Sequence, residues 1–541
     1  MSLETPVLAA VVHSSGSEPV TAEVRLDALR PDEVLVDVAA SGICHTDLTA
    51  IDGGSPFAYP AVFGHEGAGT VVRVGDAVTR VAPGDRVVLT FDSCGGCRRC
   101  RDGHPAYCEE FAARNYRGAR PDGSATVADR AGEPIRAAWM AQSSWATRAI
   151  ARETNVVPLG EDLPFALAAP LGCGVLTGAG TVLNVLAPAH EDRLLVVGAG
   201  SVGLAGLMAA RARGCAAVTV VEPDPARREL ALALGATRAL APAELEVRRG
   251  SFEHALDTVG SQEALDLAIG ALATPGTCAT VALRRGGNPV TVSQTALLWG
   301  RTLTGVIEGD AVPTEAVPLL VGLWRAGLFP LERLVSPFPF SRLDDAVAAA
   351  RTGAAVKAVL VMREDGATPA GAAATRGGTA ADRVRAIAAA GQGDADELAA
   401  LWDVLPEARA ADLTGLWRGT GIDTGHRIHS TLERSGWFGK NFVDDAHVQP
   451  IVCRDPDGTL VADAGLAGGG AWLADCAHRG KVTATMTYDS RPIHDHFVRV
   501  DRDTLLGVMA GRAAGDPRIP YYFVLARVEG APAGPLPERG A

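Results

Sequence analysis

The chain of 541 residues lacks an excess of positive charge: 50 Lys and Arg stand against 63 Asp and Glu, which gives a formal net charge of -13. Without an overall basic field to attract phosphate backbones or anionic membranes, we expect no nucleic-acid partner and no membrane partner. No run approaches the ~20 apolar residues that a membrane helix needs, and the first residues lack the basic and then apolar pattern of a secretory signal. We therefore expect a cytoplasmic protein of two to four domains.

Ten cysteines are present, and several of them are clustered. In a reducing compartment, clustered cysteines predict metal binding rather than disulfides. The spacing Cys94-x2-Cys97-x2-Cys100-x7-Cys108 allows four thiolates to surround one tetrahedral ion with no open position, which is typical of a structural zinc. The alternatives are an iron–sulfur cluster, for which nothing else in the chain provides a role, and disulfides, which need an oxidising compartment.

A second set of candidate metal ligands begins at residues 44–47, where a thiol, an imidazole, a hydroxyl and a carboxylate follow one another. We interpret Cys44 as a catalytic zinc ligand. Such a zinc usually has three protein ligands and one open position, and the best partners in the sequence are His65 and Cys173. Each residue alone is ordinary, because most single cysteines are small buried hydrophobes. Their combination with the dinucleotide motif that follows predicts a catalytic zinc.

Residues 193–213 form a short apolar run that opens into G-x-G-x-x-G and continues as an Ala-rich helical pattern. The motif glycines are Gly198, Gly200 and Gly203. A second apolar run ends in Glu222, about twenty residues after the last glycine, where a carboxylate accepts hydrogen bonds from ribose hydroxyls and repels a 2′-phosphate. This predicts NAD rather than NADP. Arg227 and Arg228 are close enough in sequence to serve a phosphate, but we interpret them as part of a solvated helix face.

Alternating apolar and polar residues over 6–40, followed by glycine turns, predict an all-β lobe of Greek-key or barrel type. After the dinucleotide motif, strand patterns at 255–260, 277–282 and 302–306 alternate with helical ones and predict a doubly wound parallel sheet. Residues 311–363 have the pattern of helices, turns and a final strand, which we interpret as a return to the first lobe.

The remaining residues differ in composition and pattern. Residues 364–380 are rich in Ala, Gly and Thr and fit a flexible linker. Helical patterns at 381–390 and 394–405 precede a region of alternating polar and apolar residues, clearest at 481–488. We expect an antiparallel barrel of lipocalin-like character.

His494 and His496 are two residues apart on a predicted strand of this region, so both side chains project to one face. Such a pair can bind a metal, transfer protons or hydrogen-bond within a polar patch, and no third metal ligand is evident. We keep both as candidate catalytic residues beside the structural alternative. Their possible companions are His429, Glu433, Lys440 and Asp495.

Together the motifs of residues 6–363 resemble the zinc-dependent medium-chain alcohol dehydrogenases, most closely the aryl or allylic primary alcohol dehydrogenases similar to benzyl alcohol dehydrogenase. The resemblance rests on the four-cysteine loop and on segments 42–47, 64–67, 142–147, 170–174 and 305–310. Farther on, residues 415–419 resemble the GXWXG family, and residues 491–497 resemble the domain of unknown function 4334. This second resemblance implies no activity.

The dehydrogenase resemblance implies one catalytic and one structural zinc per chain, with NAD carrying the hydride. It implies that Asp47 orients His65 and that Glu66 lies near the catalytic zinc. Thr46 matches the hydroxyl that takes the alcohol proton, whereas Thr49 stands where many members continue the relay with a histidine. Cofactor contacts are further implied for His45, Thr177, Ser201, Val202 and Lys357.

We therefore expect an α/β architecture with a GroES-like catalytic domain at 1–155, completed by 311–363, and a Rossmann domain at 156–310. The linker at 364–380 would lead to a GXWXG-like barrel at 381–541. The expected reaction is the oxidation of a small apolar aryl or allylic primary alcohol, terpenoids included, to its aldehyde, by a homodimer or homotetramer. The barrel is expected either to convert the conjugated aldehyde further, as an isomerase or lyase, or only to bind ligand or mediate assembly.

Overall fold

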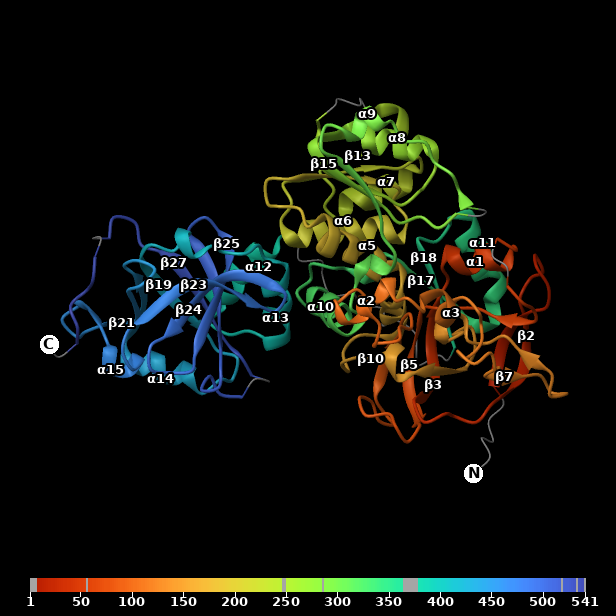
Figure 1. Ribbon diagram of the computed structural model, residues 1–541, viewed down its shortest axis with the longest axis horizontal. Coiled ribbons are helices and arrows are strands. Elements are labelled where there is room, and N and C mark those ends of the chain that lie inside the picture. Colours follow the sequence, from red (N-terminus) through yellow and green to blue (C-terminus); the bar gives the residue numbers. More distant parts are fainter. Residues whose placement is uncertain are drawn as a thin grey trace. The chain divides into compact units, whose positions relative to one another are not determined.

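The computed structural model describes residues 7–54, 57–245, 250–284, 287–362, 378–516, 519–531 and 534–539. The chain divides into two compact units, one of Met1–Arg211 with Cys215–Thr375 and one of Ala212–Gly214 with Arg376–Ala541. They contain the red-to-green and the blue elements of Figure 1, respectively. Most of the predicted linker lies outside the described residues, and helix α12 already begins at Ala380.

The first unit contains a β lobe of two sheets. One sheet has the order β4-β1-β2-β7-β8, and the other has the order β10-β6-β5-β3-β18-β17, with β9 paired to β3. The first sheet consists of β1 (Val7–Val12), β2 (Val20–Leu26), β4 (Ala61–Val62), β7 (Val127–Ala128) and β8 (Pro134–Ile135). The second consists of β3 (Glu33–Gly42), β5 (Gly67–Val74), β6 (Arg86–Leu89), β9 (Arg148–Arg152), β10 (Val156–Pro158), β17 (Val335–Pro339) and β18 (Lys357–Val361).

The period-two pattern of β3 explains its place at the centre of this lobe. Val34, Val36 and Val38 all face a core that also contains Val71 and Val87. Strand β18, more than 300 residues later, pairs antiparallel with the end of β3. Residues 335–361 therefore supply strands to the same sheet as the N-terminal residues.

The dinucleotide motif lies in a six-stranded parallel sheet of order β13-β12-β11-β14-β15-β16, the doubly wound arrangement that the sequence predicts. Its strands are β11 (Arg193–Val197), β12 (Ala217–Val221), β13 (Arg238–Leu240), β14 (Phe252–Asp257), β15 (Leu272–Thr280) and β16 (Arg301–Gly305). The strand order reverses between β11 and β14, and ligands of such sheets bind outside the carboxyl ends of the strands at this point.

Helices of the first unit are short in the β lobe and longer around the parallel sheet. In the lobe they are α1 (His45–Ile51), α2 (Arg98–Arg101) and α3 (Phe111–Asn115). The others are α4 (Phe165–Ala168), α5 (Gly174–Gly180), α6 (Ser201–Arg213), α7 (Pro225–Ala233), α8 (Gln262–Ala271), α9 (Gln294–Leu297), α10 (Pro313–Arg325) and α11 (Leu343–Thr352).

The second unit is an antiparallel barrel, as predicted. Its eight strands have the order β20-β19-β27-β26-β25-β24-β23-β21, and pairing of β20 with β21 closes the barrel. A further strand, β22, pairs with β21. The strands are β19 (Gly415–Ile422), β20 (Trp437–Phe442), β21 (Val448–Arg454), β22 (Leu460–Ala462), β23 (Ala471–His478), β24 (Lys481–Tyr488), β25 (His494–Asp501), β26 (Thr504–Ala510) and β27 (Tyr521–Arg527). The helices are α12 (Ala380–Ala390), α13 (Ala395–Val404), α14 (Ile428–Ser435) and α15 (Ala464–Ala467).

One face of each barrel strand points to an apolar interior. On β24, Ala484, Met486 and Tyr488 belong to the interior core, and the threonines between them face outward. Gly419 of β19 also faces inward, because a Cβ there would lie 2.3 Å from the Trp437 indole. Glycine at this position therefore makes room for a large aromatic side chain.

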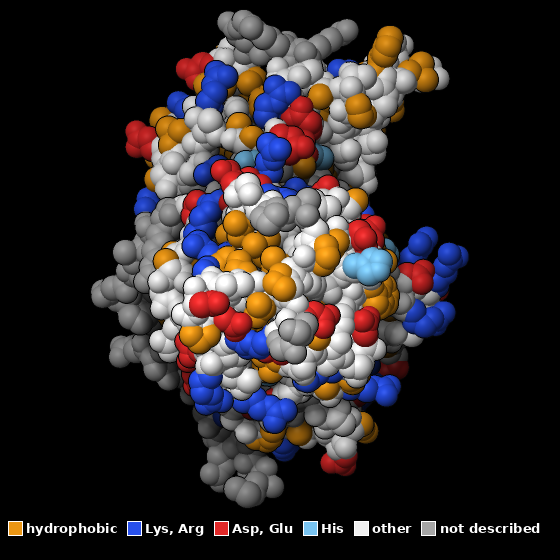
Figure 2. Space-filling view, turned by 90° about the vertical axis from the view of Figure 1, so that its left-hand side faces the viewer, with side chains coloured by type: hydrophobic (Ala, Val, Ile, Leu, Met, Phe, Trp, Pro, Cys, Tyr) orange, Lys and Arg blue, Asp and Glu red, His pale blue; other side chains and the backbone are white. Residues whose placement is uncertain are grey.

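Acidic and basic side chains are interspersed over the face shown in Figure 2, with hydrophobic side chains gathered between them. Within the part of the chain that the structure describes, no single helix is long and apolar enough to cross a membrane. Two consecutive helical segments, Phe165–Gly172 and Gly174–Leu186, are together long and apolar enough, but the chain bends by 60° between them.

Candidate active site

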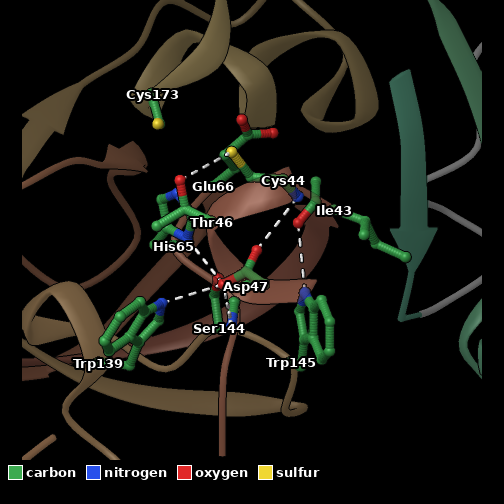
Figure 3. Close-up of polar contacts among 12 residues, drawn as sticks. Ile43, Cys44, Thr46, Asp47, His65, Glu66, Trp139, Ser144, Trp145 and Cys173 are labelled. Carbon is green, nitrogen blue, oxygen red and sulfur yellow. Dashed lines mark hydrogen bonds and ion pairs between the residues drawn. The ribbon is translucent and has the colours of Figure 1, made fainter. Parts of the chain in front are cut away.

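The three predicted ligands of the catalytic zinc converge in the first unit. Cys44 lies between β3 and α1, His65 between β4 and β5, and Cys173 at the start of α5. Their ligand atoms all lie within 4.8 Å of one another, and Figure 3 shows the two sulfur atoms approaching from different segments of the chain. His65 and Cys173 are buried. Residues separated by up to 129 positions thus form one cluster.

Asp47 fixes the orientation of His65. Its Oδ1 lies 2.7 Å from Nδ1 of His65 and accepts hydrogen bonds from the Gly64 N–H at 3.1 Å and the Trp139 indole N–H at 3.0 Å (Figure 3). The other oxygen, Oδ2, accepts from the backbone N–H of Cys44 at 3.1 Å. A carboxylate at Nδ1 places the ring proton there and leaves the lone pair on Nε2.

The donor atoms fit a zinc ion. Nε2 of His65 is buried with no hydrogen-bond partner, so its lone pair is available to a metal ion. The hydrogen bond from Cys173 lowers the pKa of Cys44 well below its usual range, although burial opposes the shift. The same contact, together with burial, raises the pKa of Cys173 well above its usual range. Two sulfur atoms and one imidazole nitrogen are a ligand set that zinc prefers.

Two further carboxyl groups lie beside this cluster. Glu66 forms a buried ion pair with Lys357, with Nζ 2.7 Å from Oε1, and also accepts a hydrogen bond from the Gly174 N–H at 3.0 Å. Glu308 lies 3.8 Å from the Cys173 sulfur, and burial raises its pKa to about 7. Glu308 lies in the family segment 305–310, but no feature of the sequence indicates that it is a site residue.

Aromatic side chains form a wall beside His65, centred on Trp139. The Trp139 ring lies 5.2 Å from Phe57, 5.5 Å from Phe63, 5.7 Å from Tyr116 and 6.4 Å from the His65 ring, measured between centroids. The sequence patterns did not indicate Trp139, because no metal-ligand or catalytic motif contains it. Its indole N–H donates to Asp47, which ties the wall to the metal-binding residues.

The four-cysteine loop is a second cluster whose sulfur atoms all lie within 4.8 Å of one another. Backbone N–H groups of Cys97 and Glu110 donate to the sulfur atoms of Cys94 and Cys108 at 3.2 and 3.4 Å. Backbone hydrogen bonds from Glu109 and Cys100 lower the pKa of Cys97 to about 6. These backbone donors therefore stabilise negative charge on the Cys97 sulfur, whereas burial raises the pKa of Cys100 and Cys108. All four must be deprotonated to bind zinc.

The three motif glycines occupy different environments at the start of α6. Gly198 has a φ of +97°, which favours glycine. A Cβ on Gly203 would lie 1.9 Å from the carbonyl oxygen of Gly198, so only glycine lets the helix pack this closely on the strand. Gly200 has no neighbouring atom within 4 Å of such a Cβ and leaves the backbone open to a ligand. A pyrophosphate bound at this helix N-terminus needs the helix packed closely on the strand and a backbone without side chains at the point of approach.

Glu222 lies at the end of β12 and is buried. Its side chain accepts hydrogen bonds from the backbone N–H groups of Ala199 at 2.7 Å and Asp224 at 3.0 Å, which hold the carboxylate beside the glycine turn. Arg228 donates to the carbonyl oxygen of Glu222, and Arg227 donates to that of Gly353. Both arginines therefore bind backbone carbonyls in this structure.

Among the other predicted cofactor residues, Thr177, Ser201 and Val202 lie on α5 and α6. A Cβ on Gly174 would lie 3.2 Å from Nζ of Lys357 and 3.5 Å from Oγ of Ser201, so these two side chains meet near the N-terminus of α6. Lys357 is buried and ion-paired, whereas His45 is exposed on α1. Val202 follows Ser201 on α6, and Thr177 is buried on α5.

Residues 30–161 match the alcohol dehydrogenase GroES-like domain, and residues 201–322 match the zinc-binding dehydrogenase domain. The geraniol dehydrogenase of Castellaniella defragrans is 42% identical over 363 residues, which cover 65% of this chain and 97% of that protein. The chain belongs to the zinc-dependent alcohol dehydrogenases. As a member of this family it uses zinc and a nicotinamide dinucleotide.

Solved structures give the same result for the dehydrogenase unit. An alcohol dehydrogenase zinc-binding domain protein from Burkholderia ambifaria is 41% identical with a TM-score of 0.65, and the match covers 66% of this chain and 100% of that one. The benzyl alcohol dehydrogenase of Acinetobacter calcoaceticus is 36% identical with a TM-score of 0.64 over the same shares. In the second unit of this alcohol dehydrogenase, residues 400–458 match the GXWXG protein family and residues 469–527 match the domain of unknown function 4334.

The two candidate histidines of the second unit share one face, but this face is the outside of the barrel. Nδ1 of His496 lies 2.8 Å from the Thr485 hydroxyl, and Nδ1 of His494 lies 3.0 Å from the Thr487 hydroxyl, on the outward positions of β24. The His496 ring stacks on His478 at a centroid distance of 3.8 Å. A pocket of about 410 Å³ borders His478.

This histidine cluster does not form a third metal site within the described ranges. There, only the two cysteine-containing clusters bring three or more ligand atoms within 4.8 Å of one another. Among the companions considered from the sequence, Asp495 and Lys440 instead lie inside the barrel, where they form an ion pair. The catalytic role of His494 and His496 stays a prediction, and it does not involve the barrel interior.

Proposed function

We propose that this alcohol dehydrogenase oxidises an aryl or allylic primary alcohol, terpenoids included, to its aldehyde, reversibly and with NAD. The observation that carries the proposal is the convergence of Cys44, His65 and Cys173 beside the aromatic wall at Trp139. An apolar wall next to a metal site favours a substrate with a flat, conjugated body. The names of the similar proteins, geraniol dehydrogenase and benzyl alcohol dehydrogenase, agree with this substrate class.

We infer that Cys44, His65 and Cys173 hold the catalytic zinc and that Cys94, Cys97, Cys100 and Cys108 hold the structural one. When bound, the catalytic zinc supplies a Lewis acid that lowers the pKa of the alcohol hydroxyl, and NAD supplies the hydride acceptor. Asp47 keeps the lone pair of His65 on Nε2 by accepting a hydrogen bond from the protonated Nδ1.

Thr46 is the residue to which we assign the alcohol proton. Its hydroxyl oxygen lies 3.7 Å from the Cys44 sulfur, at the edge of the zinc-binding cluster. A hydroxyl both accepts and donates a proton, so Thr46 can pass it outward toward solvent or a ribose hydroxyl. Thr49 lies one turn along the same helix and carries no imidazole, so we expect no histidine-mediated outer relay from this position.

NAD is proposed over NADP because of Glu222. Its carboxylate is held by two backbone N–H groups beside the glycine turn, where a 2′-phosphate would meet negative charge. Arg227 and Arg228 donate to the carbonyl oxygens of Gly353 and Glu222 instead of facing this position freely. His45, Thr177, Ser201, Val202 and Lys357 complete the proposed cofactor contacts.

We further propose the domain boundaries given by the sequence patterns and an assembly of two or four chains. Leu298 and Trp299 precede the edge strand β16 and are 72% and 65% exposed. Large apolar side chains at a sheet edge support an interface with another copy. Light scattering on the wild type and on a Leu298→Ser and Trp299→Ser double variant would test this.

The experiment that tests the activity supplies the full-length protein with NAD or NADP and a panel of benzylic, allylic and saturated primary alcohols. We expect NADH formation with the first two classes and identification of the aldehyde by mass spectrometry. Equal rates with saturated and conjugated alcohols would contradict the substrate class, and equal kcat/KM with both dinucleotides would contradict the cofactor preference.

A further inference from the structure

The barrel interior contains a buried polar cluster that the dehydrogenase reaction does not use. Lys440 of β20 and Asp495 of β25 form an ion pair, with Nζ 2.8 Å from Oδ2, and each side chain is only 2% exposed. Nζ also lies 3.1 Å from the Pro450 carbonyl oxygen and 3.4 Å from the Tyr488 hydroxyl. The Tyr488 hydroxyl donates to the same Asp495 oxygen at 3.2 Å. The cluster combines one positive and one negative charge in an otherwise apolar core.

Three buried polar atoms around this cluster have no hydrogen-bond partner: Oδ1 of Asp495, the hydroxyl of Tyr521 and Nδ1 of His429. Each such atom costs about 1–3 kcal/mol when it stays unsatisfied. On adjacent strands, Asp495 of β25 is paired with Met509 of β26, and Met509 is paired with Tyr521 of β27. The unpartnered oxygens of Asp495 and Tyr521 therefore lie at the same level of the barrel interior. A polar group bound in the interior would satisfy them.

The inner glycine of β19 brings two of these atoms together. A Cβ on Gly421 would lie 2.4 Å from the Tyr521 hydroxyl and 3.1 Å from Nδ1 of His429. Around them the interior is apolar and aromatic, because the Phe523 ring centroid lies 5.1 Å from Nζ of Lys440 and Trp437 packs edge-on against Phe523 at 5.9 Å. The unpartnered polar atoms therefore lie among apolar and aromatic side chains, the surroundings that an apolar molecule with one polar end requires.

The charges restrict that polar end to a neutral group. A carboxylate or phosphate placed near Lys440 would also face the unpaired oxygen of Asp495 and be repelled. A carbonyl group is neutral, and its oxygen can accept a hydrogen bond from the unpartnered Tyr521 hydroxyl. The three N–H groups of the Lys440 ammonium already point to Asp495, Pro450 and Tyr488, so Lys440 contributes its positive charge. The free oxygen of Asp495 is then left to act on the carbon skeleton.

We propose that the barrel interior binds an α,β-unsaturated aldehyde and isomerises its double bond, with Asp495 Oδ1 as the base, Tyr521 donating a hydrogen bond to the carbonyl oxygen and Lys440 supplying positive charge. The inference rests on the proposed function, because the dehydrogenase unit would supply this aldehyde. It also restricts the alcohol to one with a C–H bond at the γ carbon of the aldehyde product. A benzylic substrate has none.

The step is a reversible proton transfer. Asp495 removes the γ proton, the C–H electron pair forms a double bond between the β and γ carbons, and charge moves through the former α–β double bond to the carbonyl oxygen. Lys440 and Tyr521 stabilise that charge. Rotation about the α–β bond, now single, and return of the proton from Asp495 to the γ carbon give the other geometric isomer. No oxidant, reductant or second substrate is needed.

The test supplies the full-length protein with 3-methylbut-2-enal in D2O without NAD and follows deuterium uptake at the methyl groups by mass spectrometry and NMR. We expect catalysed uptake by the wild type and a loss of at least about 100-fold in Asp495→Asn, since general acid–base catalysis contributes 10²–10⁴-fold. Asp489→Asn makes the same chemical change at an exposed turn and should behave as the wild type.

A second variant is needed because Asp495→Asn can lose activity by misfolding. Tyr521→Phe removes an unpartnered buried hydroxyl, so its unfolding midpoint should stay unchanged or rise, whereas deuterium uptake should fall about tenfold. Wild-type uptake equal to the solvent rate, or uptake unchanged in both variants, would overturn the proposal. Cleavage of the aldehyde instead of exchange would also overturn it.

Failure of this inference is distinguishable from failure of the proposed dehydrogenase. Exchange is measured on the aldehyde without NAD, and alcohol oxidation is measured separately through NADH formation. Oxidation without exchange refutes the barrel reaction alone, and exchange without oxidation refutes the dehydrogenase assignment alone. With E and Z isomers of a longer enal, chromatography should show interconversion by the wild type and not by Asp495→Asn.

Discussion

Oδ1 of Asp47 lies 2.7 Å from Nδ1 of His65, and the opposite ring nitrogen, Nε2, is buried with no partner. One carboxylate therefore determines which nitrogen of the ring is available to a metal. The same oxygen also accepts from the backbone of Gly64 and the indole of Trp139. Metal-binding residues and aromatic wall are thereby connected through a single atom.

Replacing Asp47 should weaken the catalytic zinc without removing any of its ligands. In Asp47→Asn the imidazole loses its charged partner, and loss of such a contact typically costs 10–100-fold in metal affinity or activity. We expect this loss in a competition titration with a chromophoric chelator. Asp52→Asn is the matched control, because Asp52 caps the C-terminal end of the same helix and pairs with Arg351 instead of His65. Equal zinc affinity in both variants would refute the orienting role.

Cys44→Ser should lower kcat by about a thousandfold, equivalent to about 4 kcal/mol at 1.36 kcal/mol per factor of ten, because the Lewis acid supplies several kcal/mol. Zinc content should fall from two ions to one per chain, while NAD affinity, measured by NADH fluorescence, stays within twofold. Cys476→Ser, in the second unit, is the control. Full activity in Cys44→Ser would eliminate this residue as a ligand.

Cys100→Ser should have the complementary effect. The four-cysteine cluster contains no candidate catalytic residue, and a zinc bound there would stabilise the local fold. Loss of this zinc should therefore lower the unfolding temperature by several degrees. Zinc content should again fall by one ion, but the protein that remains folded should keep most of its kcat. A thousandfold loss of kcat at unchanged stability would contradict a structural role.

Glu222→Gln should shift the cofactor preference toward NADP. The amide still accepts hydrogen bonds from backbone N–H groups but no longer repels a 2′-phosphate, so we expect the ratio of kcat/KM for NAD over NADP to fall by about tenfold, or 1.4 kcal/mol. Glu229→Gln, on the following helix, is the control. An unchanged ratio would show that Glu222 does not read the ribose.

Acidification should destabilise the barrel through its outer histidines. Burial lowers the pKa of His478 to about 4 and that of His496 to about 3, with like charge from Arg479 and His478, respectively, acting in the same direction. The unfolded chain, with a pKa near 6.5, then binds protons first, so stability is present above about pH 6.5 and is lost as the pH falls toward 4. The loss reaches at most about 1.4 kcal/mol per pH unit for each histidine.

Hydrogen exchange followed by mass spectrometry should show this loss of protection in peptides from β23 and β25 between pH 6.5 and 4.5, after correction for the intrinsic exchange rates. His478→Phe keeps a ring against Trp402, which lies 5.2 Å from His478, but removes one titrating group. Its protection should depend less steeply on pH. The same steep dependence in the variant would disprove the assignment to His478.

Sequence patterns predicted candidate zinc ligands that the structure brings together, because ligand chemistry restricts residue type strongly and spacing moderately. Cys44 and the four-cysteine loop are recognisable for this reason, and the parallel sheet is recognisable from its glycine motif. Trp139 and Glu308 were missed because an aromatic wall and a buried carboxyl group have no fixed spacing to the metal ligands. Their proximity depends on the turn before β9 and on the segment that follows β16.

Alternation along β25 predicted correctly that His494 and His496 share one face, since side chains of a strand alternate. It did not say which face, because that depends on how eight strands close and on which side collects the apolar residues. Closure places Asp495, the residue between the histidines, inside the barrel with Lys440.

The sequence by itself thus determined the local elements, the family motifs and the residue types able to bind zinc and a dinucleotide, because these depend on short-range periodicity and side-chain chemistry. Only the tertiary structure decided which other distant residues meet: Trp139 with Asp47, Lys357 with Glu66, and Lys440 with Asp495. Such pairings follow from sheet order and barrel closure, which are set by packing of the whole chain and not by the spacing of any segment.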